Sequence, residues 1–170
     1  MPVFVVTGFL DAGKTTFLTQ ILEEEGFSEE DKTLLIMCEE GEAEYDEKTL
    51  SELNIDVVSV DSQEDFTPEF LADCARIYKP ECIFIEYNGM WKTQDLFDMK
   101  LPKGWFFNQV VTIVDGSTFD VYLNNMRSLM MDIFAQSELV IFNRCDEDMP
   151  LNSYRRSIKA VNRRAQVIFE

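Results

Sequence analysis

Histidine is absent from the 170-residue sequence, and the four cysteines are scattered without a C-x-x-C pair. A disulfide framework and a zinc knuckle both need closely spaced cysteines, so the sequence indicates neither. Long apolar runs are also absent, which excludes a predicted membrane-spanning helix. Because an apolar strand pattern starts at the N-terminus, no signal peptide is predicted, and we expect a cytoplasmic protein without a membrane partner.

Basic residues are few. The chain has 15 Lys and Arg against 32 Asp and Glu, a formal net charge of −17. This charge opposes broad association with polyanions, so nucleic acid is not an expected partner. The hydrophobic fraction of 46% and the length of one ordinary domain predict a single folded domain over residues 1–170.

Residues 3–17 have the order of a strand, a loop and a helix, and read V-F-V-V-T-G-F-L-D-A-G-K-T-T-F. The loop matches G-x-x-x-x-G-K-[ST], with Gly8, Gly13, Lys14 and Thr15 at the fixed positions. The alternative is a tight turn with a solvated lysine. Because all four positions match between a strand and a helix, the pattern favours a phosphate-binding P-loop.

Each fixed position of this loop has a physical task. Glycine adopts backbone angles that let successive N–H groups surround phosphate oxygens, and the following helix directs its positive end at the same anion. Lys14 would reach the β- and γ-phosphates, and the Thr15 hydroxyl would join the Mg²⁺ shell. The predicted phosphate-binding residues are Gly8, Asp11, Ala12, Gly13, Lys14, Thr15 and Thr16.

Strand and helix patterns alternate along the chain. Strands are expected over 3–7, 33–38, 55–60, 82–86, 109–115, 139–142 and 166–169, and helices over 14–25, 47–53, 65–78, 119–134 and 153–161. This alternation predicts an α/β fold, a three-layer P-loop NTPase fold with a mostly parallel sheet flanked by helices.

Three local expectations follow from the same patterns. We expect strand 33–38 to lie beside the P-loop strand and Ser117 to be a helix N-cap. We expect the aromatic-rich segment 91–107 to form a lid on the core; a partner surface is the alternative for that segment.

Glu86 closes the apolar strand 82–86. In P-loop NTPases the strand beside the P-loop strand ends in a carboxylate that holds Mg²⁺, because this ion prefers hard oxygen ligands. Glu86 fits that position, and Gly89 could present its N–H to a γ-phosphate. The alternative is a surface glutamate at a strand end.

Asn143 and Asp146 follow the strand 139–142. An aspartate there can accept hydrogen bonds from N1–H and the 2-amino group of guanine, which adenine cannot supply. A buried asparagine nearby can tie this base loop to the P-loop. An ordinary Asn/Asp-rich turn is the alternative.

These motifs stand in order with Cys38-Glu39-Glu40-Gly41-Glu42 and Val111-Thr112-Ile113-Val114-Asp115. The whole set resembles the CobW-type P-loop GTPases, relatives of the hydrogenase and urease nickel-insertion GTPases. The resemblance implies GTP/GDP and Mg²⁺ binding, slow hydrolysis, a possible homodimer, and coupling to metal delivery toward a client metalloprotein or to cobalamin-related metal insertion. It assigns Lys14 and Glu86 to catalysis, Thr15, Glu40 and Glu86 to the metal shell, Gly89 to the γ-phosphate, and Asn143 and Asp146 to the base.

Three features depart from that family pattern. Residues 59–70 lack the C-x-C-C motif, so a transported zinc, cobalt or nickel ion loses its usual ligands. Arg144 replaces the lysine of N-K-x-D, and its flat guanidinium could stack on a base. The family's C-terminal domain is not part of the expected domain 1–170. A metal held by Cys38 and the acidic residues 39, 40 and 42 is an alternative, although one thiolate among carboxylates makes a poor soft-metal site.

The leading hypothesis is a GTPase in which Lys14 and Mg²⁺ neutralise charge on the β- and γ-phosphates. No residue is assigned to orient the attacking water, so slow turnover is expected. The alternatives are a nucleotide-gated protein-binding module with negligible turnover and an ATP-using P-loop enzyme.

Overall fold

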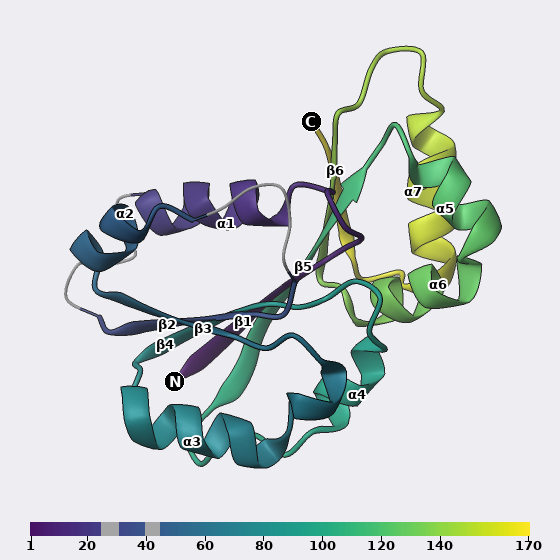
Figure 1. Cartoon of the computed structure of the whole chain (residues 1–170). Coiled ribbons are helices and arrows are strands. Elements are labelled where there is room, and N and C mark those ends of the chain that lie inside the picture. Colours follow the sequence, from purple (N-terminus) through teal and green to yellow (C-terminus); the bar gives the residue numbers. More distant parts are fainter. Residues whose placement is uncertain (25–30, 40–44) are drawn as a thin grey trace.

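The computed structural model describes residues 1–24, 31–39 and 45–170. Seven strands form one sheet in the order β3-β2-β4-β1-β5-β6-β7 (Figure 1). Every strand pair is parallel, in agreement with the mostly parallel sheet that the sequence predicts. The strands are β1 Pro2–Thr7, β2 Thr33–Met37, β3 Ile55–Ser59, β4 Cys82–Glu86, β5 Phe106–Asp115, β6 Leu139–Asn143 and β7 Gln166–Phe169.

Helices cover both faces of this sheet. Figure 1 shows α1 and α2 on one face, α3 and α4 on the other, and α5 to α7 grouped at the β5–β6 end. The predicted three-layer arrangement is therefore confirmed. The helices are α1 Lys14–Glu23, α2 Glu47–Glu52, α3 Pro68–Tyr78, α4 Thr93–Asp98, α5 Phe119–Asn125, α6 Arg127–Gln136 and α7 Leu151–Val161, with a 3₁₀ turn at Gln63–Asp65.

The P-loop strand β1 lies in the middle of the sheet, between β4 and β5. Its side chains alternate between two buried clusters: Val3 and Val5 pack toward α3 and α4, whereas Val6 packs toward α1. Burial on both faces explains its continuous apolar run. The loop after β1 therefore emerges at the centre of the edge where ligand residues gather in parallel sheets.

Strand β2 is not the neighbour of β1, because β4 pairs with both of them. The expectation that strand 33–38 lies beside the P-loop strand is wrong. The sequence shows strand identity but not strand order, which depends on how the crossover connections pack. By contrast, the strand that ends in Glu86 does lie beside β1, as expected.

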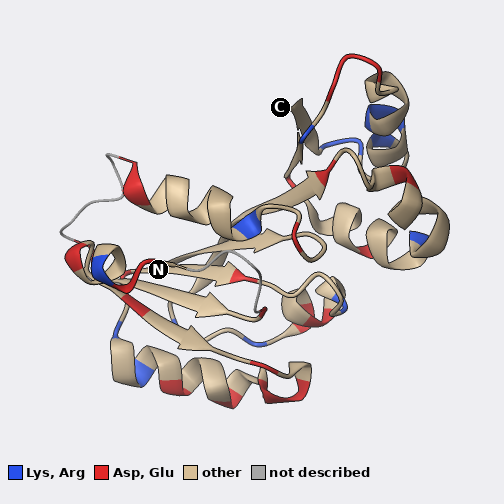
Figure 2. Cartoon of the chain, turned by 45° about the horizontal axis from the view of Figure 1, so that its top comes forward, with Lys and Arg blue, Asp and Glu red and all other residues tan. Residues whose placement is uncertain are grey.

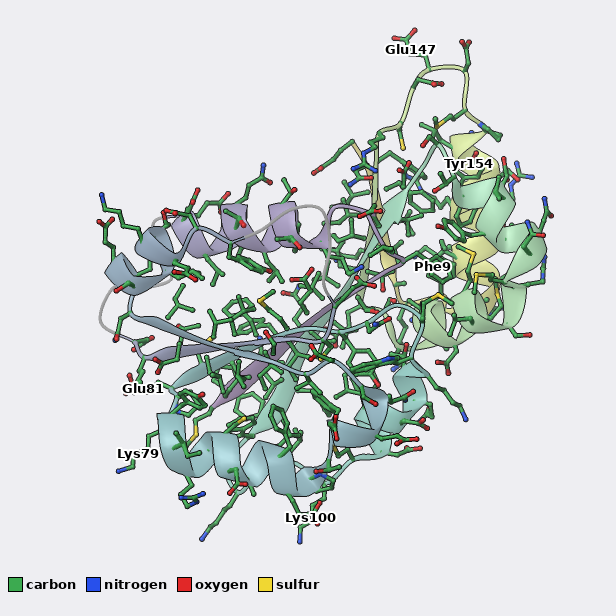
Figure 3. The ribbon with its side chains drawn as sticks, in the orientation of Figure 1. Phe9, Lys79, Glu81, Lys100, Glu147 and Tyr154 are labelled. Atoms are coloured by element: carbon green, nitrogen blue, oxygen red, sulfur yellow. The ribbon has the colours of Figure 1, made fainter. Side chains whose placement is uncertain are left out.

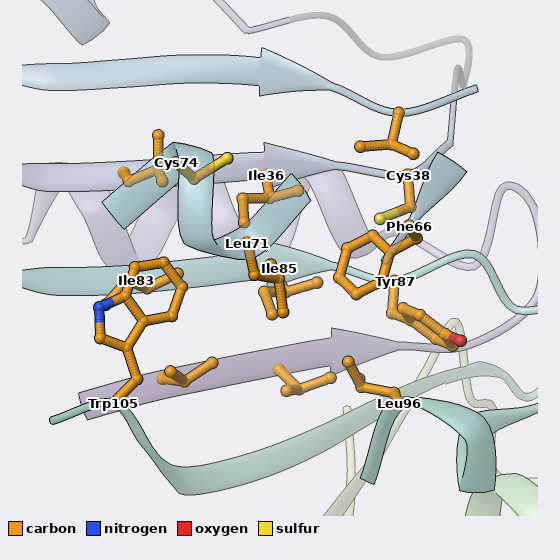
Figure 4. Packing of buried hydrophobic residues seen from close by; sticks show 14 of the residues in the cluster. Ile36, Cys38, Phe66, Leu71, Cys74, Ile83, Ile85, Tyr87, Leu96 and Trp105 are labelled. Atoms are coloured by element: carbon orange, nitrogen blue, oxygen red, sulfur yellow. The ribbon is translucent and has the colours of Figure 1, made fainter. Parts of the chain in front are cut away.

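The segment 91–107 folds back onto the core. Leu96 is fully buried and Trp105 is 7% exposed, both in the cluster under β1 and β4 (Figure 4). Trp91, Phe97 and Met99 pack against the same cluster. These side chains therefore belong to the core, in agreement with the first of the two sequence interpretations, whereas Phe106 of the same segment is 52% exposed.

Two local expectations fail around residues 117–134. The helical pattern breaks at Met126 into α5 and α6. Ser117 is not an N-cap: Thr118 occupies that position, and Ser117 instead donates its hydroxyl to Asp115. A short polar side chain can satisfy a nearby turn as well as a helix end, so sequence alone does not separate these roles.

Acidic residues lie on most surface elements, including α3 and the loop that joins β6 to α7 (Figure 2). Within the described part of the chain, no helix has the length and apolar character needed to cross a bilayer.

Candidate functional site

The loop between β1 and α1 is pressed against the ends of β5 and β6. Gly8 and Gly13 have φ angles of 135° and 101°, in the region that favours glycine. A Cβ at Gly8 would lie 2.1 Å from the carbonyl oxygen of Ile113, and one at Gly13 would lie 2.6 Å from Nδ2 of Asn143. Only glycine fits at either position.

Phe9 anchors this loop from behind. Its ring is 7% exposed and stacks on Tyr122 with 4.4 Å between ring centroids. Figure 3 shows Phe9 between the loop and the helices α5 and α6. The contact fixes the position of the loop relative to β5 and its helices.

Lys14 is the first residue of α1 and is 3% exposed. Its Nζ donates to the carbonyl oxygens of Gly8 and Phe9, each at 2.8 Å, and forms an ion pair with Glu39. Burial raises the pKa of the Glu39 carboxyl by more than Lys14 lowers it. The ammonium is thus held over its own loop, with a carboxylate beside it.

Glu86 lies at the end of β4 and is 2% exposed. Its carboxylate accepts from the Thr15 hydroxyl at 2.7 Å and from the Tyr45 hydroxyl at 2.6 Å. Burial and the Glu86 carboxylate together raise the pKa of Tyr45 well above its usual value. These two hydroxyl donors stabilise a buried charge that has hard oxygen atoms suited to Mg²⁺.

Sequence reasoning missed Tyr45. It precedes α2 and reaches Glu86 across 41 residues of chain, with no motif around it that marks the contact. The loop after Glu86 is closer to its expected place: a Cβ at Gly89 would lie 2.0 Å from the Gly8 carbonyl oxygen. Gly89 therefore packs directly on the P-loop.

The base loop also contacts the P-loop. Asn143 donates Nδ2–H to the carbonyl oxygen of Ala12 at 2.6 Å, the tie that the sequence suggests. Its Oδ1 is buried without a partner among the described residues. Asp146 is exposed, and its Oδ1 accepts from the main-chain N–H of Asp148 at 3.0 Å, which is an Asx turn.

Most of the predicted site residues lie in one place. The structure brings together the P-loop, Glu86, Gly89 and Asn143 at the carboxyl ends of β1, β4 and β6. Thr16 is exposed one residue further along α1, and Asp146 is on the exposed loop. Glu40 lies outside the described residues.

Soft-metal ligands are dispersed. Cys38, Cys74 and Cys82 are buried, and Cys145 is half-buried. Among residues 1–24, 31–39 and 45–170, no group of three or more His, Cys, Asp or Glu side chains is placed to hold a metal ion.

Several solved structures share the fold. The Zn(II)-bound YjiA GTPase from E. coli aligns with a TM-score of 0.69 and 24% identity, covering 98% of this chain and 56% of that one. Hydrogenase maturation factor HypB from Archaeoglobus fulgidus aligns with a TM-score of 0.66 and 16% identity, covering 100% and 81%. The chain thus spans little more than half the length of YjiA. No curated protein matches its sequence.

The sequence also matches a family model over nearly its full length. The model, described as CobW/HypB/UreG, nucleotide-binding domain, covers residues 2–169. The motifs and the P-loop architecture agree with that match. The chain belongs to the CobW/HypB/UreG family of nucleotide-binding domains.

Proposed function

We propose that this chain binds GTP and GDP with Mg²⁺ and hydrolyses GTP slowly. The observation that carries the proposal is the convergence of Lys14, Glu86 and Asn143 on one glycine-bounded loop. Each comes from a different element, and each has the chemistry that a nucleotide triphosphate needs.

The phosphate side of the site fits an anion and a hard cation. Gly8 and Gly13 let the loop lie close against the ends of β5 and β6, because a Cβ at either position would collide with Ile113 or Asn143. The Thr15 hydroxyl and the Glu86 carboxylate offer oxygen ligands to Mg²⁺. When bound, the ion supplies positive charge beside the phosphates. Lys14 supplies the second positive charge from the protein itself.

The base side supports guanine. Asn143 holds the base loop on the P-loop through Ala12, while its buried Oδ1 has no partner among the described residues. An unpaired buried acceptor is costly, so a ligand donor at this point would stabilise the site. Asp146 is exposed to solvent, and one of its carboxylate oxygens accepts from the Asp148 N–H. To accept two hydrogen bonds from a guanine edge, the carboxylate would give up this bond to Asp148.

Lys14 is engaged before a nucleotide binds, and the described residues supply little help to turnover afterwards. The ion pair with Glu39 occupies the P-loop ammonium, so phosphate oxygens must compete with a carboxylate for it. No described residue is assigned to orient an attacking water. A complementing residue from a second copy in a homodimer, or from a partner, would raise the rate.

A nucleotide-gated binding module is the second candidate. Tyr45 connects the start of α2 to Glu86 through its hydroxyl. A movement of the Glu86 carboxylate when Mg²⁺ and nucleotide bind would therefore be transmitted to α2. In this reading the nucleotide orders a surface for a client metalloprotein in the cytoplasm, and hydrolysis is negligible. Zn(II)-bound YjiA and the maturation factor HypB support a metal-linked client. Neither candidate function includes a tightly held zinc, cobalt or nickel ion as cargo, because the chain has no histidine and its cysteines are dispersed.

The first experiment titrates fluorescent GDP and ATP analogues with and without Mg²⁺. Wild type is measured beside Lys14→Ala and Asp146→Ala. The proposal expects a guanine preference that Asp146→Ala abolishes, and loss of all binding in Lys14→Ala. Equal affinity for both nucleotides would favour the ATP-using alternative, and absence of binding would overturn the proposal.

Turnover separates the two candidate functions. Phosphate release from GTP is measured for wild type and Glu86→Gln at matched nucleotide occupancy. A GTPase predicts slow release by wild type that Glu86→Gln reduces further. Release at the uncatalysed rate by a wild type that binds GTP would instead favour the gated module.

A further inference from the structure

Arg144 joins the base loop to the P-loop at a second point, beside the Asn143 contact. Its Nη1 donates to the carbonyl oxygen of Asp11 at 2.9 Å and also to the Asp115 carboxylate. Among the described residues, the guanidinium makes two polar contacts, and Nη1 is the donor in both. The Arg144 side chain is 54% exposed, so the rest of its planar group remains open to solvent.

The Asp115 carboxylate is fixed before it meets Arg144. Its Oδ1 accepts from the Ser117 N–H at 2.8 Å and from the Ser117 hydroxyl, which leaves Oδ2 directed at Arg144. Its side chain is only 13% exposed. Although burial raises the pKa of Asp115, the bonds from Ser117 and Arg144 outweigh it and hold that pKa below its usual value. Asp115 is therefore charged at neutral pH.

Strain in the main chain occurs at both ends of this contact. Asp11 and Arg144 have φ angles of 57° and 53°, which residues with a Cβ rarely adopt. Four non-glycine residues of the described chain have positive φ, and two of them meet in the single hydrogen bond from Arg144 to Asp11. Such conformations persist where the surrounding contacts hold them in place, and they cluster at ligand sites.

The end of β5 is packed tightly on the base loop. Gly116 donates its N–H to the carbonyl oxygen of Asn143 at 2.9 Å, and a Cβ at Gly116 would lie 2.8 Å from Sγ of Cys145. Asp115 is thus held by a rigid strand end on one side and by Ser117 on the other. A carboxylate with so little freedom can determine where the longer arginine side chain rests.

We propose that Asp115 is a positioning residue of the nucleotide site, which holds the Arg144 guanidinium on the Asp11 carbonyl and so clamps the base loop to the P-loop. This inference rests on the proposed nucleotide-binding function. In the clamped form the phosphate cradle and the base loop keep one fixed spacing, and the nucleotide meets a preorganised site. Without Asp115, Arg144 loses its charged partner and the left-handed main chain at Asp11 loses a support.

A double-mutant cycle on fluorescent GDP affinity tests the clamp. Asp115→Asn keeps the size and the Ser117 contacts but removes the charge, and Arg144→Gln removes the guanidinium. We expect each single variant, and the double variant as well, to bind GDP about 10-fold more weakly than wild type, because both remove one shared interaction. Arg144→Lys keeps a charge that reaches Asp115, so we expect partial rescue, to about 3-fold weaker than wild type.

Asp120→Asn is the matched control. Asp120 lies near the start of α5 and accepts from the Tyr154 hydroxyl at 3.0 Å, a bond that joins α5 to α7 and involves neither Asp115 nor Arg144. Its GDP affinity should equal that of wild type. The dissociation rate of GDP is the second readout, because a loss of general stability would not accelerate it selectively in the Asp115 and Arg144 variants. If Asp115→Asn does not fold, Ser117→Ala tests the same carboxylate and should weaken binding about 3-fold.

Two results overturn the clamp while leaving the proposed function intact. One is GDP binding by Asp115→Asn within 2-fold of wild type. The other is a double variant about 100-fold weaker than wild type, the product of two independent effects. Failure of wild type to bind any nucleotide would overturn both the clamp and the proposed function.

Discussion

The carboxylate of Glu39 is paired with the ammonium of Lys14 inside the P-loop, where a nucleotide phosphate is expected to bind. Both side chains are buried, at 8% and 3% exposure. A buried ion pair is stable only while both partners are present, so the arriving phosphates must replace Glu39 as the counter-ion of Lys14. The protein thereby carries an internal competitor for its own ligand.

Glu39→Gln should bind GDP and GTP more tightly than wild type. The amide retains the volume but not the charge, so Lys14 no longer has an anionic partner to exchange. We expect affinity to rise by about 5-fold or more, measured by fluorescent nucleotide titration. Asp73→Asn, which breaks the exposed pair with Arg76, is the control and should leave affinity unchanged. Equal or weaker binding by Glu39→Gln would show that the pair does not compete with the nucleotide.

The same pair predicts a pH dependence. Burial raises the pKa of Glu39, so the carboxyl takes up its proton above the ordinary carboxyl range. The protonated form no longer competes for Lys14. The advantage of Glu39→Gln over wild type should therefore shrink as the pH falls from about 8 to about 5, with titrations of both proteins at each pH. Comparison of the two proteins cancels protonation of the nucleotide itself. A constant ratio of affinities would contradict this account.

Tyr45→Phe should destabilise the nucleotide-free protein. The change removes the hydroxyl at 2.6 Å from the buried Glu86 carboxylate and leaves Thr15 as its donor. Hydrogen bonds to charged groups contribute about 1.5–3 kcal/mol, and we expect a loss of that size in the free energy of unfolding by urea. Tyr78→Phe, a ring that packs on the core cluster, should change it by less than about 0.5 kcal/mol. Similar values for the two variants would argue against a stabilising bond from Tyr45 to Glu86.

Asn143→Asp should weaken nucleotide binding more than Asn143→Ala. The aspartate directs an oxygen at the Ala12 carbonyl, where Nδ2 now donates at 2.6 Å, whereas alanine only removes the donor. We expect at least about a 10-fold loss of GDP affinity for the aspartate variant. Asn162→Ala is a suitable control, because Asn162 donates to Phe134 and Ser137 far from the loop. It should lower stability without changing the affinity of the folded fraction.

Gly89→Ala should displace the P-loop. The new Cβ would lie 2.0 Å from the Gly8 carbonyl oxygen and 2.9 Å from Cα of Phe9, and neither backbone atom can move alone. Overpacking of this kind costs about 1–3 kcal/mol, and we expect a matching loss in GDP affinity. Gly104→Ala introduces strain at a φ of 87° with only Met1 nearby, so it should destabilise the fold but spare binding. Unchanged GDP affinity in Gly89→Ala would mean that the loop can shift without consequence.

Local patterns were sufficient for the identity of the strands and for the P-loop motif, although not for the order of the strands in the sheet. Apolar runs of four to seven residues separated by helical periodicity predict strands of a mostly parallel sheet, and β1 to β7 confirm them. The fixed spacing of Gly8, Gly13 and Lys14 predicts a phosphate loop because consecutive residues build it. Glu86 could be placed beside that loop from its position at a strand end. In the structure its carboxylate accepts a hydrogen bond from the Thr15 hydroxyl of the loop.

Contacts between distant segments could not be predicted in the same way. The partner of Lys14 depends on where β2 ends relative to β1, and β4 separates these strands. The partner of Arg144 depends on the tight packing of β5 against the base loop. Tyr45 has no motif, so its contact with Glu86 appears only in three dimensions. The role of Asp146 in base selection remains a prediction.

The central position of β1 also determines when the site can form during synthesis. The strand that bears the P-loop is made well before its partners β4 and β5, which begin at residues 82 and 106. Pairings this distant in sequence form slowly and close long stretches of chain. On a ribosome, β1 must therefore wait without its two neighbours until β4 and β5 have also emerged. A nucleotide can therefore stabilise the P-loop in its final position only after this pairing, late in the formation of the sheet.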